Sequence, residues 1–387
     1  MPWAMLFLSL TVASWLYWLV ASWCVASFFA EPQPQPGADL PPVSILKPVR
    51  GLDAQAYENF ASFLAQDYPE DYEVLFGVSD PRDPAIEVIH HLQREHPERR
   101  IDTFVAPSRG PNDKVSILCH LAQQARYDVL VISDSDMRVT PDYLRRVCAP
   151  LQDPNVGLVT CLYQGEQAKT FTAKLEAQYM ATTFLPSALV GRHYLHMGFA
   201  LGASNALRRQ QLQQIGGFEA LVNYLADDYQ LGARIAATGH RVHLSDYVMQ
   251  SVLGATTFRE QWNREVRWNK CLRVSRPLEY RALIVTFPTP VALITAGLMG
   301  FSLPSLAIVA ISLILRWLVS WQVARQTHDQ VFRSSWFWLP LRDLLTGAIW
   351  CVACVGRQVT WRSQRFTLRK GGFLQQLLPK ETHEVAR

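Results

Sequence analysis

The chain has 387 residues and a formal net charge of +4, and only 18% of its residues are charged, whereas a soluble domain typically has about 25%. Residues 1–30 and 282–315 carry no charge, while residues 31–281 carry 26 basic and 29 acidic side chains. The segment 282–387 carries 11 basic and 4 acidic side chains. A domain of soluble composition therefore lies between apolar segments, which excludes a disordered chain, a small disulfide scaffold and an ordinary cytosolic enzyme.

Residues 1–30 form an apolar run that is longer than the ~20 residues a membrane-spanning helix needs. A secretory signal peptide is the alternative, but no basic residue precedes the run, which also contains Trp15, Trp18 and Trp23. We therefore expect a retained transmembrane anchor, followed by a stiff proline-rich linker over 31–42.

Three further apolar runs lie in the segment 282–356, which we expect to contact the membrane. They lie near 283–302, 304–324 and 336–355. The last run contains Arg342 and Asp343, and an ion pair there must face protein or water or lie near an interface. Seven basic residues in the tail 357–387 place the tail and the central domain in the cytoplasm by the positive-inside rule. That orientation requires an even number of crossings, so one run is predicted to be re-entrant or interfacial.

Short apolar runs alternate with helical patterns at the start of the central domain, which we bound at 43–254. Strands are predicted at Val43–Leu46, Glu73–Val78, Ile101–Val105 and Val129–Ile132. Helices are predicted near 55–66, 85–96, 113–126 and 141–150. This alternation predicts an α/β domain with a parallel sheet, in which ligands bind at the carboxyl ends of the strands.

Acidic residues follow two of these strands. Asp80 comes directly after the second strand, and Asp134-Ser-Asp136 follows the fourth. Asp residues also start turns and cap helices, and this alternative is strongest for Asp80 alone. Two carboxylates that flank one small residue concentrate negative charge. A hard cation such as Mg²⁺ or Mn²⁺ would compensate that charge and leave positions for phosphate oxygens.

Charged residues also precede the membrane segments. Asp227 and Asp228 come directly before a helical pattern, where either could cap the helix or act as a base on an acceptor hydroxyl. Arg264 and Arg267 are three residues apart in the segment 255–281, so on a helix they share one face. They would either anchor an interfacial helix to anionic lipid or clamp a diphosphate through their forked donors.

Taken together, these motifs resemble membrane glycosyltransferases with a GT-A (Rossmann-like) α/β domain and α-helical transmembrane segments. The resemblance is closest to the ceramide glucosyltransferase family, glycosyltransferase family 21. The similar stretches are 44–51, 67–69, 80–86, 112–114, 157–159, 226–229, 264–268 and 361–368. Within the family, the segments 112–118, 131–138 and 224–232 resemble the bacterial hopanoid-biosynthesis branch, which transfers N-acetylglucosamine from its UDP-sugar to bacteriohopanetetrol.

Two positions differ from the ceramide-type pattern and weigh against a ceramide acceptor. Asp136 stands where ceramide-type enzymes carry Gly, and Asn205 stands where they carry Cys. The main expectation is therefore transfer of N-acetylglucosamine to bacteriohopanetetrol. The alternative is a ceramide glucosyltransferase that uses UDP-glucose. More remote alternatives are a processive polysaccharide synthase, a dolichyl-phosphate sugar synthase and a non-enzymatic lipid transporter.

The resemblance also implies roles for individual residues in an inverting transfer from a UDP-sugar to a lipid hydroxyl. The residues expected to contact the donor are Asp80, Lys47, Arg50, Lys114 and Asp134. Asp134 and Asp136 are expected to hold Mg²⁺ or Mn²⁺. Arg264 and Arg267, beside Trp268, are expected to neutralise the charge of the departing UDP, and Asp228 is expected to act as the base. The implied partners are a UDP-sugar, a hopanoid or ceramide lipid and the bilayer, with no nucleic acid. The implied location is the bacterial inner membrane, with a multi-pass chain and a cytoplasmic catalytic domain.

Overall fold

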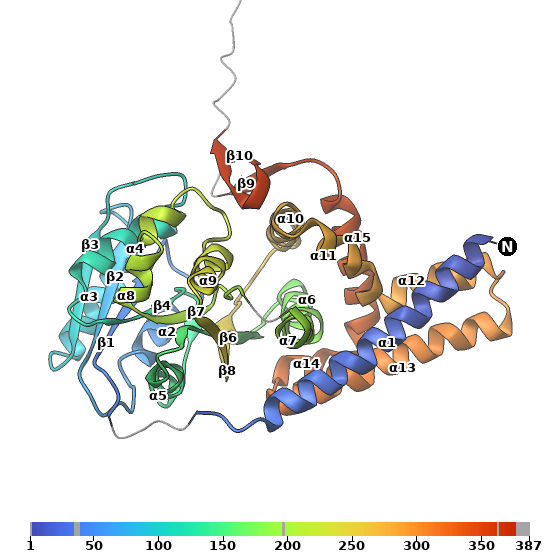
Figure 1. Ribbon diagram of the computed structural model, residues 1–387, viewed down its shortest axis with the longest axis horizontal. Coiled ribbons are helices and arrows are strands. Elements are labelled where there is room, and N and C mark those ends of the chain that lie inside the picture. Colours follow the sequence, from blue (N-terminus) through green and yellow to red (C-terminus); the bar gives the residue numbers. More distant parts are fainter. Residues whose placement is uncertain (1, 35–38, 196–197, 362–363, 377–387) are drawn as a thin grey trace, which may run out of the picture.

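The computed structural model describes residues 2–34, 39–195, 198–361 and 364–376 (Figure 1). An α/β domain lies at one end of the molecule, long apolar helices lie at the other, and a layer of helices lies between them. Part of the predicted linker and the last residues of the predicted basic tail fall outside the described residues.

The α/β domain is built on a mixed sheet of eight strands in the order β3-β2-β1-β4-β7-β6-β8-β5. The strands are β1 Val43–Pro48, β2 Tyr72–Val78, β3 Arg100–Val105, β4 Val129–Ser133, β5 Met137–Arg138, β6 Val156–Glu166, β7 Ser204–Arg208 and β8 Arg241–Val252. The four predicted strands are confirmed and pair in parallel. The prediction of a parallel sheet is wrong beyond β4, because β7 runs antiparallel to both β4 and β6.

Helices cover both faces of this sheet, so its central strands are apolar on both sides. They are α2 Ala56–Ser62, α3 Ala85–Glu95, α4 Asp113–Gln124, α5 Tyr143–Cys148, α8 Arg209–Gln214 and α9 Asp227–Ala237. Successive strand residues enter opposite cores: Ile45 and Val74 pack in one, and Leu46 and Leu75 in the other. The helices predicted near 55–66, 85–96, 113–126 and 141–150 are confirmed as α2 to α5.

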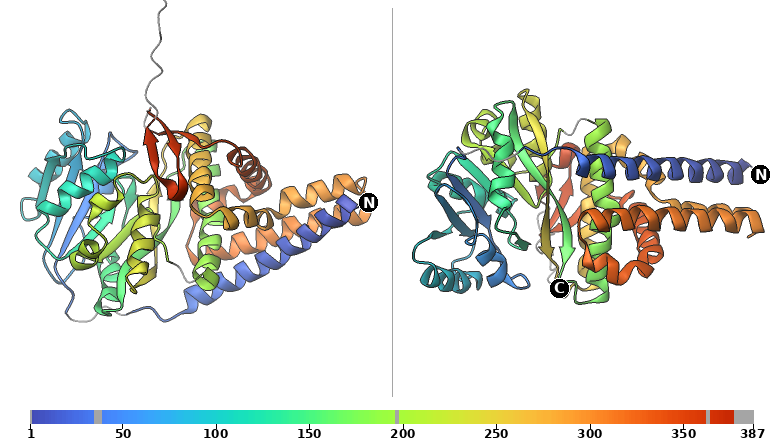
Figure 2. Two further views of the ribbon diagram at one scale, coloured as in Figure 1. Left: turned by 45° about the horizontal axis from the view of Figure 1, so that its top comes forward. Right: turned by 90° about the horizontal axis from the view of Figure 1, so that it is seen from below.

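The middle layer closes over the carboxyl-end side of the domain. It contains α6 Phe171–Tyr179, a π-helical turn Met180–Phe184, α7 Leu185–Leu195, α10 Phe258–Ser275 and α11 Pro277–Ala282. A small antiparallel sheet, β9 Gln358–Trp361, β10 Gln364–Leu368 and β11 Leu374–Gln376, packs beside α10 (Figure 2). Backbone bonds from Leu225 N–H to the Gly372 carbonyl and from Leu374 N–H to the Asn223 carbonyl tie this sheet to the domain. The described part of the tail therefore folds back onto the α/β domain.

The apolar helices are α1 Pro2–Ala30, α12 Pro288–Leu298, α13 Leu303–Gln326, α14 Gln330–Ser335 and α15 Leu339–Ala353. Within the described residues, α1 and α13 are each long and apolar enough to cross a membrane. The pair Pro277–Thr286 and Pro288–Leu298, bent by 65°, is either a broken span or a re-entrant loop. The 15 residues of α15 extend about 22 Å, which is less than the ~30 Å hydrocarbon core.

The predicted ion pair between Arg342 and Asp343 is wrong, because consecutive residues of a helix do not face each other. Arg342 instead pairs with Glu265 at 2.7 Å, and Asp343 pairs with Arg316 at 2.7 Å. Both residues nevertheless face protein, as expected for charges in an apolar run.

Candidate active site

A cavity of about 410 Å³, here called the helix-side cavity, lies between the α/β domain and the middle layer. Its charged lining residues are Lys114, Asp134, Asp136, Asp227, Asp228, Arg264 and Arg267. Its apolar and aromatic lining includes Met137, Tyr163, Tyr179, Met180, Phe184, Leu272 and Leu283. All of the acids come from the α/β domain, whereas both arginines and most of the apolar side chains come from helical segments outside it.

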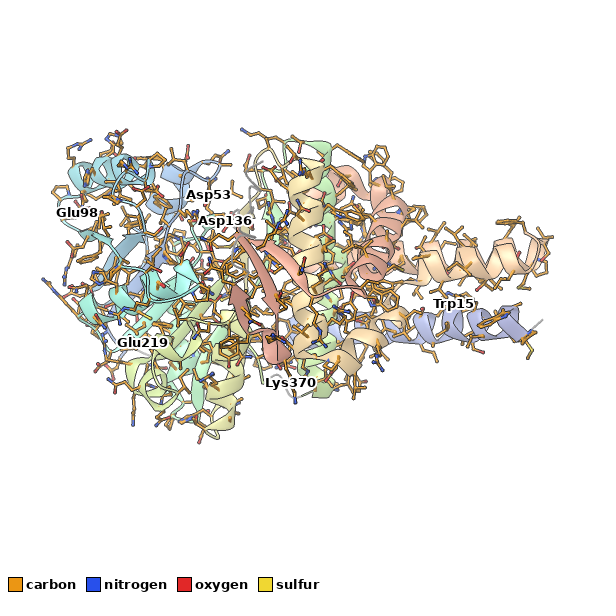
Figure 3. The ribbon with its side chains drawn as sticks, turned by 90° about the horizontal axis from the view of Figure 1, so that it is seen from above. Trp15, Asp53, Glu98, Asp136, Glu219 and Lys370 are labelled. Carbon is orange, nitrogen blue, oxygen red and sulfur yellow. The ribbon has the colours of Figure 1, made fainter. Side chains whose placement is uncertain are left out.

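A second cavity of about 350 Å³, the sheet-side cavity, lies at the carboxyl ends of β1 and β4. It is lined by Pro48, Val49, Arg50, Asp53, Ile117 and Ser135, and by four residues that it shares with the helix-side cavity, Lys114, Asp134, Asp136 and Arg267. Figure 3 labels Asp53 and Asp136, which lie close together on the side of the domain that faces the helices. The two cavities therefore meet at two acids and two bases.

Lys114 links two of the acidic motifs. Its Nζ lies 2.6 Å from Oδ1 of Asp134 and 3.7 Å from Oδ2 of Asp227. Burial alone would lower the pKa of Lys114, but Asp134 and Asp227 outweigh it, so the pKa is raised. The lysine is positioned by Asn112, which caps α4 through the Val115 N–H and also donates to Asp227 at 3.2 Å.

Asp53 and Asp136 are held by serine hydroxyls rather than by bases. Ser135 donates to Asp53 at 2.5 Å, and Ser251 donates to Asp136 at 2.9 Å. Burial raises the pKa of both carboxyls, and the Asp53 charge further raises the pKa of Asp136. Burial, followed by the repulsion from Asp136, likewise raises the pKa of Asp134 even though Lys114 opposes it.

No group of three His, Cys, Asp or Glu residues within the described ranges could hold a metal ion by itself. Asp134 and Asp136 share both cavities, and oxygen ligands suit Mg²⁺ and Mn²⁺. Magnesium is commonly bound by one or two carboxylates together with substrate phosphates. This donor set therefore fits a cation that is completed by a ligand, and not a closed protein site.

Asp228 lies in the first turn of α9, where its Oδ1 accepts the Tyr229 N–H at 2.8 Å. Burial and the neighbouring Asp227 raise its pKa to about 7. A Cβ atom at Gly202 would lie 3.1 Å from Oδ2 of Asp228, so this glycine leaves room for the carboxylate. The result is a carboxylate in the helix-side cavity that can accept a proton near neutral pH.

The two arginines and Trp268 stand on α10, which begins with a capping box between Thr257 and Glu260. Arg264 pairs with the buried Glu176 at 2.7 Å, and the Arg267 guanidinium lies 5.8 Å from the ring centre of Trp361. The Trp268 ring stacks on Tyr179 with 6.5 Å between ring centres. The prediction that Arg264 and Arg267 share one face is confirmed, since both line the helix-side cavity.

Three residues expected at the donor differ in their placement. Lys47 has no exposed surface, donates to the backbone carbonyl of Asp134 at 3.0 Å and is not among the described residues that line either cavity. Arg50 lines the sheet-side cavity and pairs with Asp113 at 3.1 Å. Asp80 is exposed, accepts the Arg82 N–H at 2.9 Å and is not among the described residues that line either cavity.

Three further residues of this region were missed from the sequence. Asp53 follows the first strand and its loop, and that position alone would have marked it as a strand-end acid. Glu176 and Trp361 come from a helix and from the tail, with no local pattern that points to the cavities. Asn205 is also informative: it is buried in β7, donates to the Leu201 carbonyl and is not among the described residues that line either of these cavities.

Comparison with known proteins agrees with this arrangement. The model of the family described as glycosyl transferase family 21 matches residues 6–374. The chain belongs to this family. It is therefore a glycosyltransferase, and the family resemblance of the motifs is confirmed.

Two curated family members from Caenorhabditis elegans are similar over most of the chain. Ceramide glucosyltransferase 1 is 27% identical over 352 residues, which cover 87% of this chain and 74% of the relative. Ceramide glucosyltransferase 3 is 27% identical over 362 residues, which cover 88% of this chain and 75% of the relative. Among solved structures, a mannosyltransferase from Pyrobaculum calidifontis in complex with GDP-Man and Mn2+ matches with a TM-score of 0.56 at 19% identity, covering 89% of this chain and 97% of that one. This likeness confirms the GT-A fold.

Proposed function

We propose that this family 21 enzyme transfers a sugar from a UDP-sugar to the hydroxyl of a membrane lipid. The observation that carries the proposal is the meeting of two cavities at Lys114, Asp134, Asp136 and Arg267. One cavity lies at strand ends, where nucleotides bind in α/β sheets. The other has an apolar lining contributed largely by helices next to the apolar bundle.

The donor would occupy the sheet-side cavity, with its diphosphate near Arg267 and Arg50. Asp80 would contact the nucleoside at the rim, since its loop adjoins this cavity through the bond from Gly51 N–H to Asp83. Asp134 and Asp136 would hold the divalent cation, which would supply charge neutralisation for the diphosphate when bound. The structure of the Pyrobaculum enzyme in complex with GDP-Man and Mn2+ supports a donor and a cation of this class.

Asp228 would remove the proton from the acceptor hydroxyl as its oxygen attacks the anomeric carbon. The bond from that carbon to the diphosphate breaks in the same step, so the configuration inverts without a covalent intermediate. Arg264 and Arg267 would stabilise the negative charge that develops on departing UDP. The pKa of Asp228, raised to about 7, suits a base that works near neutral pH.

A ceramide acceptor with UDP-glucose is better supported than bacteriohopanetetrol with UDP-N-acetylglucosamine, because the similar curated relatives are ceramide glucosyltransferases. Of the two departures from the ceramide-type pattern, Asp136 lines both cavities, and Asn205 is not among the described residues of the helix-side lining. A hopanoid remains the second candidate.

Placement in a bacterial inner membrane with a cytoplasmic catalytic domain is part of the same proposal. The length and apolar character of α1 and α13 support a membrane location, and the basic tail, which the positive-inside rule assigns to the cytoplasm, supports the orientation. The regions 1–30, 31–42, 43–254, 255–281, 282–356 and 357–387 would then serve as anchor, linker, catalytic domain, interfacial helix, membrane segments and tail.

The test offers ceramide and bacteriohopanetetrol together to the purified protein in lipid nanodiscs, with UDP-glucose and UDP-N-acetylglucosamine in competition. Mass spectrometry should detect a ceramide hexoside as the main product. A glycosylated hopanoid would select the second candidate, and a polymer or a glycosylated lipid phosphate would contradict both. EDTA should stop the reaction and Mn²⁺ or Mg²⁺ should restore it, whereas full activity in EDTA would contradict the cation site.

A further inference from the structure

Helix α10 is held in place by two ion pairs at consecutive positions. Arg264 pairs with Glu176 of α6 at 2.7 Å, and the Glu176 side chain has no exposed surface. Arg342 of α15 donates from Nη1 to Oε1 of Glu265 at 2.8 Å and from Nη2 to Oε2 at 2.7 Å. The side chains of Glu265 and Arg342 are 1% and 0% exposed. Adjacent residues of α10 are thus fixed from two different helices.

Neither Glu176 nor Arg342 is among the described residues that line the two cavities, so neither is suited to touch a substrate. Glu176 Oε1 accepts from Arg264, while its buried Oε2 has no hydrogen-bond partner among the residues described. A carboxylate that is buried with one oxygen unused is costly. Among the described residues, its one hydrogen-bonded ion-pair partner is Arg264, whose side chain is 34% exposed and lines the helix-side cavity.

Arg342 also has a hydrogen-bond partner in its own helix. Its guanidinium donates to Thr346 at 2.9 Å, one turn further along α15. The next residue, Asp343, pairs with Arg316 of α13, and the Arg316 guanidinium lies 3.9 Å from the ring centre of Trp18 in α1. The anchor of α10 therefore extends into the apolar bundle.

We infer that Glu176 and Arg342 are positioning residues for sugar transfer, which set where Arg264 and Arg267 stand against the donor diphosphate. The inference rests on the proposed function. An arginine side chain has many rotamers, and fixing one of them when a ligand binds weakens the affinity. This loss is avoided when the protein already holds the side chain in one rotamer before the ligand binds. Glu176 supplies that order for Arg264, and Arg342, through Glu265, fixes the turn of α10 that also carries Arg267.

The test compares the affinities of UDP and UMP, because only UDP carries the second phosphate that the arginines would hold. In the Glu176→Gln variant, we expect UDP affinity to fall about 3- to 10-fold while UMP affinity is unchanged. Turnover per UDP-binding site should fall by a similar or larger factor. Arg342→Met should shift the same ratio, and Arg342→Lys should restore part of it.

A matched control is the pair of Glu73 and Arg100 in the α/β domain. It has a distance of 2.6 Å and exposures of 1% and 28%, close to those of Glu176 and Arg264, and Glu73 does not belong to the described lining of either cavity. Glu73→Gln should lower the thermal stability without changing the ratio of UDP to UMP affinity.

An unchanged ratio in Glu176→Gln, or an equal shift in Glu73→Gln, would overturn the inference, because the pair would then be structural only. If Glu176→Gln does not fold, Glu176→Asp keeps the charge but shortens its reach, and the same shift is expected and the same unchanged ratio would overturn the inference. Failure of the wild-type protein to bind UDP would instead contradict the proposed function.

Discussion

The helical half of this protein, which comprises α1 and α10 to α15, and the catalytic half, which is the α/β domain, both bury charged side chains. The two halves balance these charges differently. In the helical half, Arg316 is paired with Asp343 and Arg342 with Glu265, each at 2.7 Å. In the catalytic half, five carboxylates line the two cavities: Asp53, Asp134, Asp136, Asp227 and Asp228. Balanced buried pairs hold helices together, whereas an excess of buried acid raises the pKa of the carboxyls, which is a feature of functional sites.

The largest expected effect is at the acid that we assign as the base. Asp228→Asn preserves the shape of the side chain but cannot accept a proton, so turnover should fall by about 10²–10⁴-fold. UDP affinity should stay close to that of the wild type, as measured by calorimetry. Turnover within a few-fold of that of the wild type would contradict the assignment of Asp228 as the base.

In the helical half, the expected effect is on stability and not on turnover. Arg316→Met should destabilise the protein by about 3–5 kcal/mol, because Asp343 is left buried without a counter-charge. The double variant Arg316→Met/Asp343→Leu should recover most of this loss. Thermal unfolding in one detergent measures both, and equal destabilisation of the single and double variants would mean that the pair itself stabilises the bundle.

The pH dependence of kcat/KM should reflect the raised pKa of Asp228. Because burial and Asp227 raise the pKa of Asp228 to about 7, the base is protonated and inactive below that pH. We therefore expect kcat/KM to fall about tenfold for each pH unit below 7 and to level off above it. A profile that stays flat from pH 5 to 8 would contradict the assignment of Asp228 as the base.

A smaller effect is expected beside the same acid. Gly202→Ala would introduce a Cβ atom 3.1 Å from Oδ2 of Asp228, and displacing the base slightly should lower kcat by about 3- to 10-fold. Gly191→Ala is the matched control, since the described residue that its new Cβ would meet is Phe199, whose ring lies 3.8 Å away. An effect of equal size in both variants would point to folding and not to the base.

The sequence predicts best what depends on neighbours along the chain. The first four strands, their helices and the acids after β2 and β4 follow from periodicity and from the rule that ligands bind at strand ends. The reversal at β7 is not predicted, because Ser204 and Asn205 are polar although both are buried. Glu176 and Trp361 reach the site region only through tertiary packing, and residue spacing does not encode that contact.

The contribution of Trp361 to the wall of the helix-side cavity affects how the enzyme is made. Domains generally fold as units, and N-terminal ones fold first during synthesis. The acids at β4 and α9 can therefore be in place while the helical segments are still being made. Because β9 follows α10 to α15 in the sequence, this wall is completed only after these helices have been synthesised. A nascent chain that ends before β9 thus holds an acidic pocket without this part of its wall.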